Sequence, residues 1–202
     1  MTQVANIILA STSTDTSWQA NNPVQVIKGD IFVVVDENHP HRLQQIQKAG
    51  RAIEKMGVEH ARLIGEYWEQ ETQWAFALGF TCVKKLTNVE FTGDEVTINT
   101  LNDKLAVYAW SRDLTNQTPA QLFPLSLAEK ASEYIKAQAP AYVTSNVVSG
   151  EALVEAKWMG IHNVGKGSIH PPCLVEIDYN PTGNDDEPVA VSLVGKGITF
   201  DS

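Results

Sequence analysis

The sequence is short of cysteine and of basic residues, and each shortage excludes a class of protein. Only two cysteines occur in 202 residues, Cys82 and Cys173, so we expect free thiols and no disulfide framework. Fifteen lysines and arginines stand against 24 acidic residues, which gives a net charge of −9. Phosphate backbones and anionic lipids would repel such a chain, so we expect neither nucleic acid nor a membrane as a partner.

Long apolar runs are absent as well. The run at residues 30–35 is far too short to cross a bilayer, and residues 1–13 lack the basic region of a signal peptide. We therefore predict a cytoplasmic protein. With 43% hydrophobic and 19% charged residues, the composition is that of a folded globular chain.

Residues 1–99 alternate predicted strands with predicted helices, which indicates an N-terminal α/β domain with a mixed sheet. The periodicity and the turn residues predict strands at 4–10, on both sides of a turn at 28–30, and at 58–64, with helices at 40–57 and 69–83. A hairpin is expected to close this domain, with strands at 88–91 and 95–98 around Thr92, Gly93 and Asp94.

Residues 100–202 follow a different pattern and are predicted to form a second domain. Ser126 and Glu129 have the spacing of a capping box at the start of a helix. The connector at 180–187 consists of turn residues, so the apolar runs on either side of it are expected to pair as an antiparallel hairpin. The expected elements are helices at 101–118, 126–138 and 150–158, a glycine-rich turn, and strands at 141–148, 172–179 and 188–194.

The glycine-rich segment from Gly160 to Ser168 nearly matches a phosphate-binding loop. That loop needs serine or threonine directly after its lysine, and Gly167 follows Lys166 here. We therefore favour a structural turn, with small-ligand binding as the weaker alternative.

Other polar residues give weaker signals, and none receives a catalytic role. His39 and His41 could form a metal cluster with Asp36 and Glu37, although a solvated loop is the more common outcome. The charge pair of Arg112 and Asp113 is interpreted as structural support of a helix end. The remaining histidines are isolated in sequence: His60, His162 and His170.

The last apolar run ends in Gly-Lys-Gly, with Lys196 followed five positions later by Asp201. Sites in open α/β sheets form at the carboxyl ends of strands, where this lysine is expected. A regular strand would point the two side chains to opposite faces, so the chain must bend between them for both to bind one ion. A lysine ligand must be neutral, and removing the proton from a free lysine at pH 7 costs about 4–5 kcal/mol.

Several motifs together resemble the leucine aminopeptidase family. Residues 193–202 are similar to the opening of its signature, and residues 110–120 to the start of its catalytic domain, with one extra residue at 116–119. The glycine-rich segment with Pro171 and Pro172 resembles another family element. Two further segments resemble the peptidase B type in particular: residues 74–79 and 178–183.

The resemblance implies an aminopeptidase that removes N-terminal residues from peptide substrates and assembles as a homohexamer. Two divalent ions, zinc or manganese, would polarise the scissile carbonyl, with Lys196 and Asp201 among their ligands. The other ligands, a catalytic lysine and an arginine would all follow Ser202. Residues 100–202 are then expected to be the incomplete start of an α/β catalytic domain, and this polypeptide alone is expected to be inactive. The alternative is a non-catalytic assembly or interaction module of the hexamer.

Overall fold

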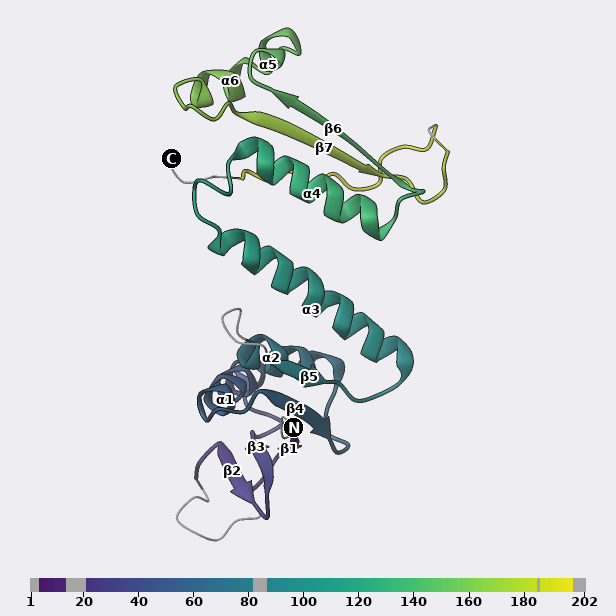
Figure 1. The fold of residues 1–202 in the computed structure, drawn as a ribbon. Helices are drawn as coiled ribbons and strands as arrows, with labels where there is room; N and C mark the ends of the chain where they lie inside the picture. The colour runs from purple at the N-terminus through teal and green to yellow at the C-terminus, as the bar shows by residue number, and fades with distance from the viewer. Residues whose placement is uncertain (1–3, 14–20, 82–86, 185, 198–202) are drawn as a thin grey trace. The chain divides into compact units, whose positions relative to one another are not determined.

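The computed structural model describes residues 4–13, 21–81, 87–184 and 186–197 (Figure 1). The chain forms two compact units, Met1–Asp113 and Leu114–Ser202. This division lies inside a long helix, after the boundary at 99 and 100 that the sequence suggests. Among the described residues, no helix is long and apolar enough to cross a membrane.

A mixed five-stranded sheet organises the first unit, in the order β2-β3-β1-β4-β5. The strands β1, β3, β4 and β5 run parallel, whereas β2 runs antiparallel to β3. The α/β fold with a mixed sheet predicted for this region is confirmed. The bounds are β1 Val4–Ala10, β2 Val24–Ile27, β3 Asp30–Val34, β4 His60–Ile64 and β5 Asn88–Glu90.

The turn predicted at residues 28–30 joins β2 and β3. Lys28 and Gly29 both have positive φ, 53° and 95°, the backbone that a two-residue hairpin loop requires. Ile27 therefore pairs with Asp30, and Gln25 with Phe32.

Two helices, α1 (Arg42–Lys55) and α2 (Gln70–Phe80), occupy the positions predicted for them. They approach each other at glycines. A Cβ on Gly50 would lie 2.6 Å from the Phe76 carbonyl oxygen, and one on Gly79 would lie 1.9 Å from that of Gln47. Only glycine permits this separation.

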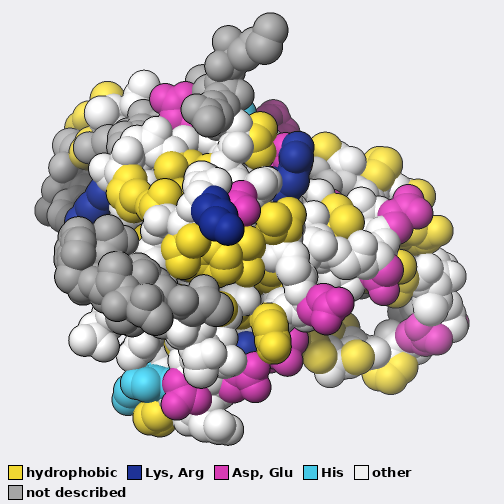
Figure 2. Space-filling model, turned by 90° about the horizontal axis from the view of Figure 1, so that it is seen from below, with side chains coloured by type: hydrophobic (Ala, Val, Ile, Leu, Met, Phe, Trp, Pro, Cys, Tyr) yellow, Lys and Arg dark blue, Asp and Glu magenta, His cyan; other side chains and the backbone are white. Residues whose placement is uncertain are grey.

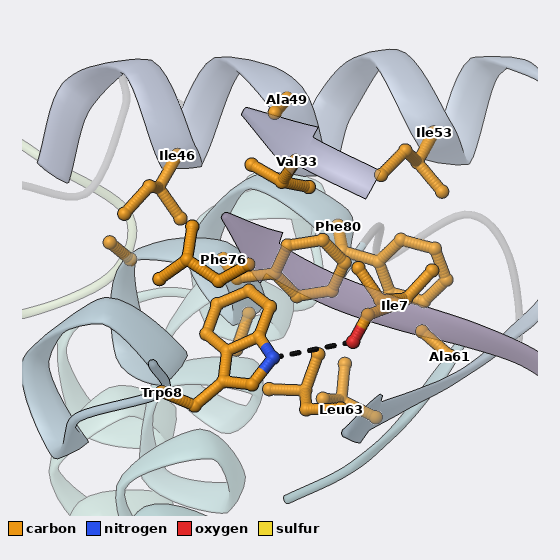
Figure 3. Packing of buried hydrophobic residues seen from close by; sticks show 14 of the residues in the cluster. Ile7, Val33, Ile46, Ala49, Ile53, Ala61, Leu63, Trp68, Phe76 and Phe80 are labelled. Carbon is orange, nitrogen blue, oxygen red and sulfur yellow. Dashed lines mark hydrogen bonds between the residues drawn. The ribbon is translucent and has the colours of Figure 1, made fainter. Parts of the chain in front are cut away.

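The core lies between these helices and one face of the sheet (Figure 3). Alternate strand residues supply it, because successive side chains of a strand point to opposite faces. The Trp68 ring packs edge-on against Phe76, with centroids 5.6 Å apart, and its Nε1 donates to the Ile7 carbonyl oxygen at 3.3 Å. The strand residues on this face are Ile7, Leu9, Ile31, Val33, Ala61, Leu63 and Val89.

The hairpin predicted at 88–98 is wrong, because a helix follows β5. The helix α3 spans Glu95–Asn116, and the Asp94 carboxylate caps it by accepting from the Thr97 N–H at 2.7 Å. Val96 and Ile98 alternate with threonine and asparagine and so mimic a strand in the sequence. The cap and the buried Leu101 one turn later favour the helix.

The second unit packs α4 (Pro124–Gln138) against an antiparallel pair, β6 (Val143–Ser149) and β7 (Cys173–Tyr179). Two short helices lie between these strands in sequence, α5 (Ala152–Glu155) and α6 (Met159–Gly165).

Three predictions for this unit are wrong. The helix α4 begins at Pro124, so Ser126 is not its N-cap; the Ser126 hydroxyl instead accepts from the Phe123 N–H at 2.9 Å. The glycine-rich segment is largely helical rather than a turn. Residues 188–194 form no strand with β7, whose partner is β6.

Candidate metal centre

The predicted metal ligand Lys196 lies in an irregular segment at residues 191–197, not at the end of a strand. Its side chain is exposed. The apolar residues before it are also open to solvent, and Leu193 and Val194 are 93% and 98% exposed. Within the second unit, the segment contacts α4 at Gly197, where a Cβ would lie 3.2 Å from Leu127 Cδ2.

The second predicted ligand, Asp201, lies outside the described residues, as does Cys82. Among the residues that the structure does describe, no group of three His, Cys, Asp or Glu side chains could hold a metal ion. The described donor set is thus Lys196 alone, and it does not by itself fit a divalent ion, which needs several ligands. The pairing of Lys196 with Asp201 stays a prediction.

Close packing explains why a glycine occupies position 165 in the segment that resembles a phosphate-binding loop. A Cβ on Gly165 would lie 2.4 Å from the Pro172 Cβ, so this glycine permits close contact between α6 and the start of β7. Lys166 is exposed at the end of the helix. This packing supports the structural interpretation, and small-ligand binding by the segment stays the alternative prediction.

The histidines at residues 39 and 41 make local contacts within their loop and with α1. His39 Nδ1 accepts from the His41 N–H at 3.0 Å, and His39 Nε2 lies 2.9 Å from Gln45 Nε2. The Asp36 carboxylate accepts from the Asn38 N–H. Both ring nitrogens of His39 are thus occupied, which agrees with a loop and not with a metal cluster.

Two further histidines contact the rest of the second unit. The His162 Nε2 lies 3.3 Å from a Glu151 carboxylate oxygen, and the His170 ring stacks on Phe123 with centroids 4.3 Å apart. In the first unit, Arg112 donates to the Thr81 carbonyl oxygen at 3.3 Å and lies over the Tyr108 ring. Arg112 therefore supports the end of α2, consistent with the structural interpretation.

A row of polar side chains crosses the sheet face opposite the core and was not identified from the sequence. Asn6 donates to the Asp30 carboxylate at 3.0 Å, and Arg62, which pairs with Asn6 in register, forms an ion pair with Glu90. Hydrogen bonding to Arg62 lowers the pKa of Glu90. Figure 2 shows the molecule from below the view of Figure 1, and on that side basic and acidic side chains lie among hydrophobic ones.

This row could not be predicted from the sequence, because its four residues come from four different strands. Each of the four is a polar residue in a strand whose apolar and polar residues alternate. They become neighbours only because of the order of the strands in the sheet. Their mutual pairing makes the row a structural feature of the sheet.

Cys173 is a free thiol, as predicted, in β7. Burial, with a smaller contribution from the negative charge of Glu129, raises its pKa. A thiol with a raised pKa is mostly protonated at neutral pH and is a poor metal ligand or nucleophile.

Two family profiles match the chain. Residues 109–202 match the catalytic domain of the cytosol aminopeptidase family, and residues 6–95 match a family described as a peptidase. Among individual relatives, peptidase B of Klebsiella pneumoniae (strain 342) is 37% identical over 203 residues, and peptidase B of Enterobacter sp. (strain 638) is 36% identical. Each alignment covers 100% of this chain and 47% of the relative, so the chain spans about half the length of these proteins.

Solved structures share the fold. The bottromycin maturation enzyme BotP in complex with Mn aligns with a TM-score of 0.66 at 18% identity, covering 90% of this chain and 46% of BotP. The cytosol aminopeptidase from Coxiella burnetii aligns with a TM-score of 0.63 at 15% identity, covering 88% of this chain and 44% of that one. At identities this low, the alignments establish a shared fold and nothing further.

Proposed function

Because the chain belongs to the cytosol aminopeptidase family, we propose that it is the N-terminal part of a metal-dependent enzyme that hydrolyses N-terminal amino acids from peptides. The observation that carries this proposal is the match of residues 109–202 to the family's catalytic domain. That match includes both Lys196 and Asp201. The peptidase B relatives, at 36–37% identity over the whole of this chain, support the same activity.

We further propose that Lys196 and Asp201 are two ligands of a dinuclear centre that holds manganese or zinc. One of the solved structures with this fold is a manganese complex, which supports a divalent metal. Our interpretation of the exposed lysine is that it needs surrounding carboxylates to complete a site, because one amine supplies a single donor and a divalent ion needs several ligands. Those carboxylates would come from the half of the relatives that these residues do not span.

It follows that the 202 residues alone should not hydrolyse peptides. One amine and one carboxylate leave most coordination positions of two ions to water, and such a site would not hold a catalytic ion. The first test is hydrolysis of leucine p-nitroanilide by the purified polypeptide with manganese. Turnover at the rate of peptidase B would overturn this part of the proposal.

The second test restores the missing half. Because the alignment covers 47% of Klebsiella pneumoniae peptidase B, and because we propose that this chain is the N-terminal part, residues 1–202 are fused to the C-terminal half of that relative. We expect the fusion to hydrolyse leucine p-nitroanilide in the presence of manganese. Lys196→Ala should reduce kcat/KM at least 100-fold.

Lys166 provides the matched control for that variant, because it is also an exposed lysine between two glycines. Lys166→Ala should keep the activity of the fusion. Equal activity of the Lys196→Ala and unsubstituted fusions would refute the assignment of Lys196. A folded fusion with no activity at all would refute the aminopeptidase proposal.

The family also suggests a cytoplasmic homohexamer, which we propose for the whole enzyme. Analytical ultracentrifugation of the fusion tests the assembly, with a mass of six chains expected. A monomer that is active would overturn the proposed hexamer without affecting the proposed chemistry.

A further inference from the structure

A groove of about 700 Å³ lies between β2 and α1 in the first unit, and none of its lining residues is assigned to the metal centre. The strand contributes Val24 and Val26. The helix contributes the side chains that face them, and the groove is lined by Asn22, Pro23, Gln45, Lys48, Ala49, Ala52 and Met56 besides the two valines. Most of these side chains are apolar.

The groove exists because α1 does not fully cover the edge of the sheet. Val24 and Val26 pair with the buried residues Val33 and Ile31, so both valines point to the face that carries the helices. Val26 is nevertheless 50% exposed. An apolar side chain on the core face of a sheet is half-exposed here because no further strand among the described residues lies beside it.

The backbone of β2 offers hydrogen bonds on the same side. In the two-residue hairpin, Ile27 and Gln25 exchange hydrogen bonds with β3, so the polar groups of Val24 and Val26 point away from the sheet. The Val34 N–H donates to the Pro23 carbonyl oxygen at 2.9 Å, which fits this alternation. The Asn22 side chain accepts from the Val24 N–H. The Val26 N–H and the carbonyl oxygens of both valines thus face the direction from which another strand could add.

The charge around the groove is opposite to that of the chain as a whole. Lys48 lines the groove, and none of the described residues that line it is acidic. The exposed Lys28 follows β2 in the turn, α1 carries the exposed Arg51, and the single acidic residue of α1, Glu54, is buried. In a chain with a net charge of −9, this edge is basic.

We propose that the groove binds an extended acidic peptide segment by strand addition to β2. The added strand would take up the outward backbone groups of Val24 and Val26. Its apolar side chains, at alternate positions, would enter the groove against Ala49 and Met56, and a carboxylate would face Lys48. A second copy of this chain fits less well, because it would present the same basic edge to the groove and would supply no carboxylate to face Lys48.

The test uses a fluorescein-labelled heptapeptide that alternates valine with threonine and has a glutamate at each end. Fluorescence anisotropy with the 202-residue chain should give saturable binding. A peptide of the same composition with its valines adjacent, and one with lysine in place of glutamate, should each bind at least fivefold more weakly. Absence of saturation by the first peptide at millimolar concentration overturns the proposal.

Variants of the chain locate the binding. Val26→Pro removes the outward N–H, and proline is tolerated on an edge strand where that N–H faces solvent. We expect at least tenfold weaker binding, with the circular dichroism spectrum unchanged. Lys48→Glu should weaken binding at least fivefold, whereas Lys55→Glu, on the same helix but outside the groove, should change it less than twofold.

Equal weakening by the two lysine variants would mean a general charge effect and would refute the site. If sedimentation shows a dimer of the unliganded chain that Val26→Pro dissociates, the occupant is a second copy and the peptide proposal fails. The peptide proposal is supported if the chain is a monomer that binds the peptide and if Val26→Pro and Lys48→Glu each weaken that binding.

Discussion

Gly79 of α2 lies against the backbone of α1 at Gln47, so closely that a Cβ on the glycine would be 1.9 Å from the Gln47 carbonyl oxygen. The partner atom belongs to the backbone, so no rotation of a side chain can relieve the contact. The separation of the two helices depends on this contact. The packing of the α2 residues Phe76 and Phe80 in the core depends on it as well.

Gly79→Ala should therefore destabilise the first unit by about 2 kcal/mol or more, because overpacking of this kind outweighs the helix propensity of alanine, which is worth about 1 kcal/mol. Hydrogen exchange of the slowest amides in α1 and β1 measures the free energy of unfolding. Gly160→Ala is the control, because nothing lies within 4 Å of a Cβ at that helical glycine. A stabilising effect of Gly79→Ala would show that the helices are not in close contact.

Gln73 should be a second weak point for substitution. Its side chain is 1% exposed, its Nε2 donates to the Thr92 carbonyl oxygen at 2.9 Å, and its Oε1 accepts from the Thr92 N–H at 2.9 Å. Gln73→Met would leave both backbone groups without these partners, and each buried unsatisfied group costs about 1–3 kcal/mol. We expect a loss of at least about 2 kcal/mol in urea unfolding. Gln44→Met, at an exposed position of α1, should change the stability little.

Asp94 should make the stability of α3 depend on pH. Hydrogen bonds from Thr97 lower the pKa of the Asp94 carboxylate in the folded chain. Its contribution is therefore present above its ordinary pKa, near 4, and is lost as the pH falls through the lower folded value. Asp94→Ala should reduce the unfolding midpoint at pH 7 and should have little effect at pH 2. A reduction of equal size at both values would contradict the capping role, and Asp103→Ala within the same helix serves as the control.

Gly165 separates the structural interpretation of the glycine-rich segment from the ligand-binding one. Gly165→Ala should destabilise the second unit by about 1–3 kcal/mol, because the new methyl group would overlap the Pro172 ring. Lys166→Ala should leave both the stability and the hydrogen exchange of β7 unchanged. Saturable binding of inorganic phosphate that Lys166→Ala abolishes would favour a ligand-binding loop instead.

Local signals predicted the elements of the first unit well. The turn residues Lys28 and Gly29 identified the β2–β3 hairpin, and the spacing of Ile46, Gly50 and Ile53 identified α1. In both cases the signal lies within a few residues of the structure that it determines. The same approach failed at Val96 and Ile98, where alternation typical of a strand occurs inside α3, a helix that the Asp94 cap and the buried Leu101 favour.

The choice of strand partners could not be predicted, because it depends on residues far apart in the sequence. The turn chemistry after Tyr179 suggested a hairpin with residues 188–194, yet β7 pairs with β6, so that Ser149 lies opposite Cys173. The candidate site has the same difficulty. Lys196 was found through its motif, and no local pattern could supply the distant carboxylates that a metal ion would need.

Metal content tests the central proposal most directly. The fusion of residues 1–202 with the C-terminal half of peptidase B is loaded with manganese, dialysed, and measured by inductively coupled plasma mass spectrometry. We expect two ions per chain, fewer in the Lys196→Ala fusion, and two in the Lys166→Ala control. Two tightly held ions in the Lys196→Ala fusion would contradict the assignment of Lys196 as a metal ligand.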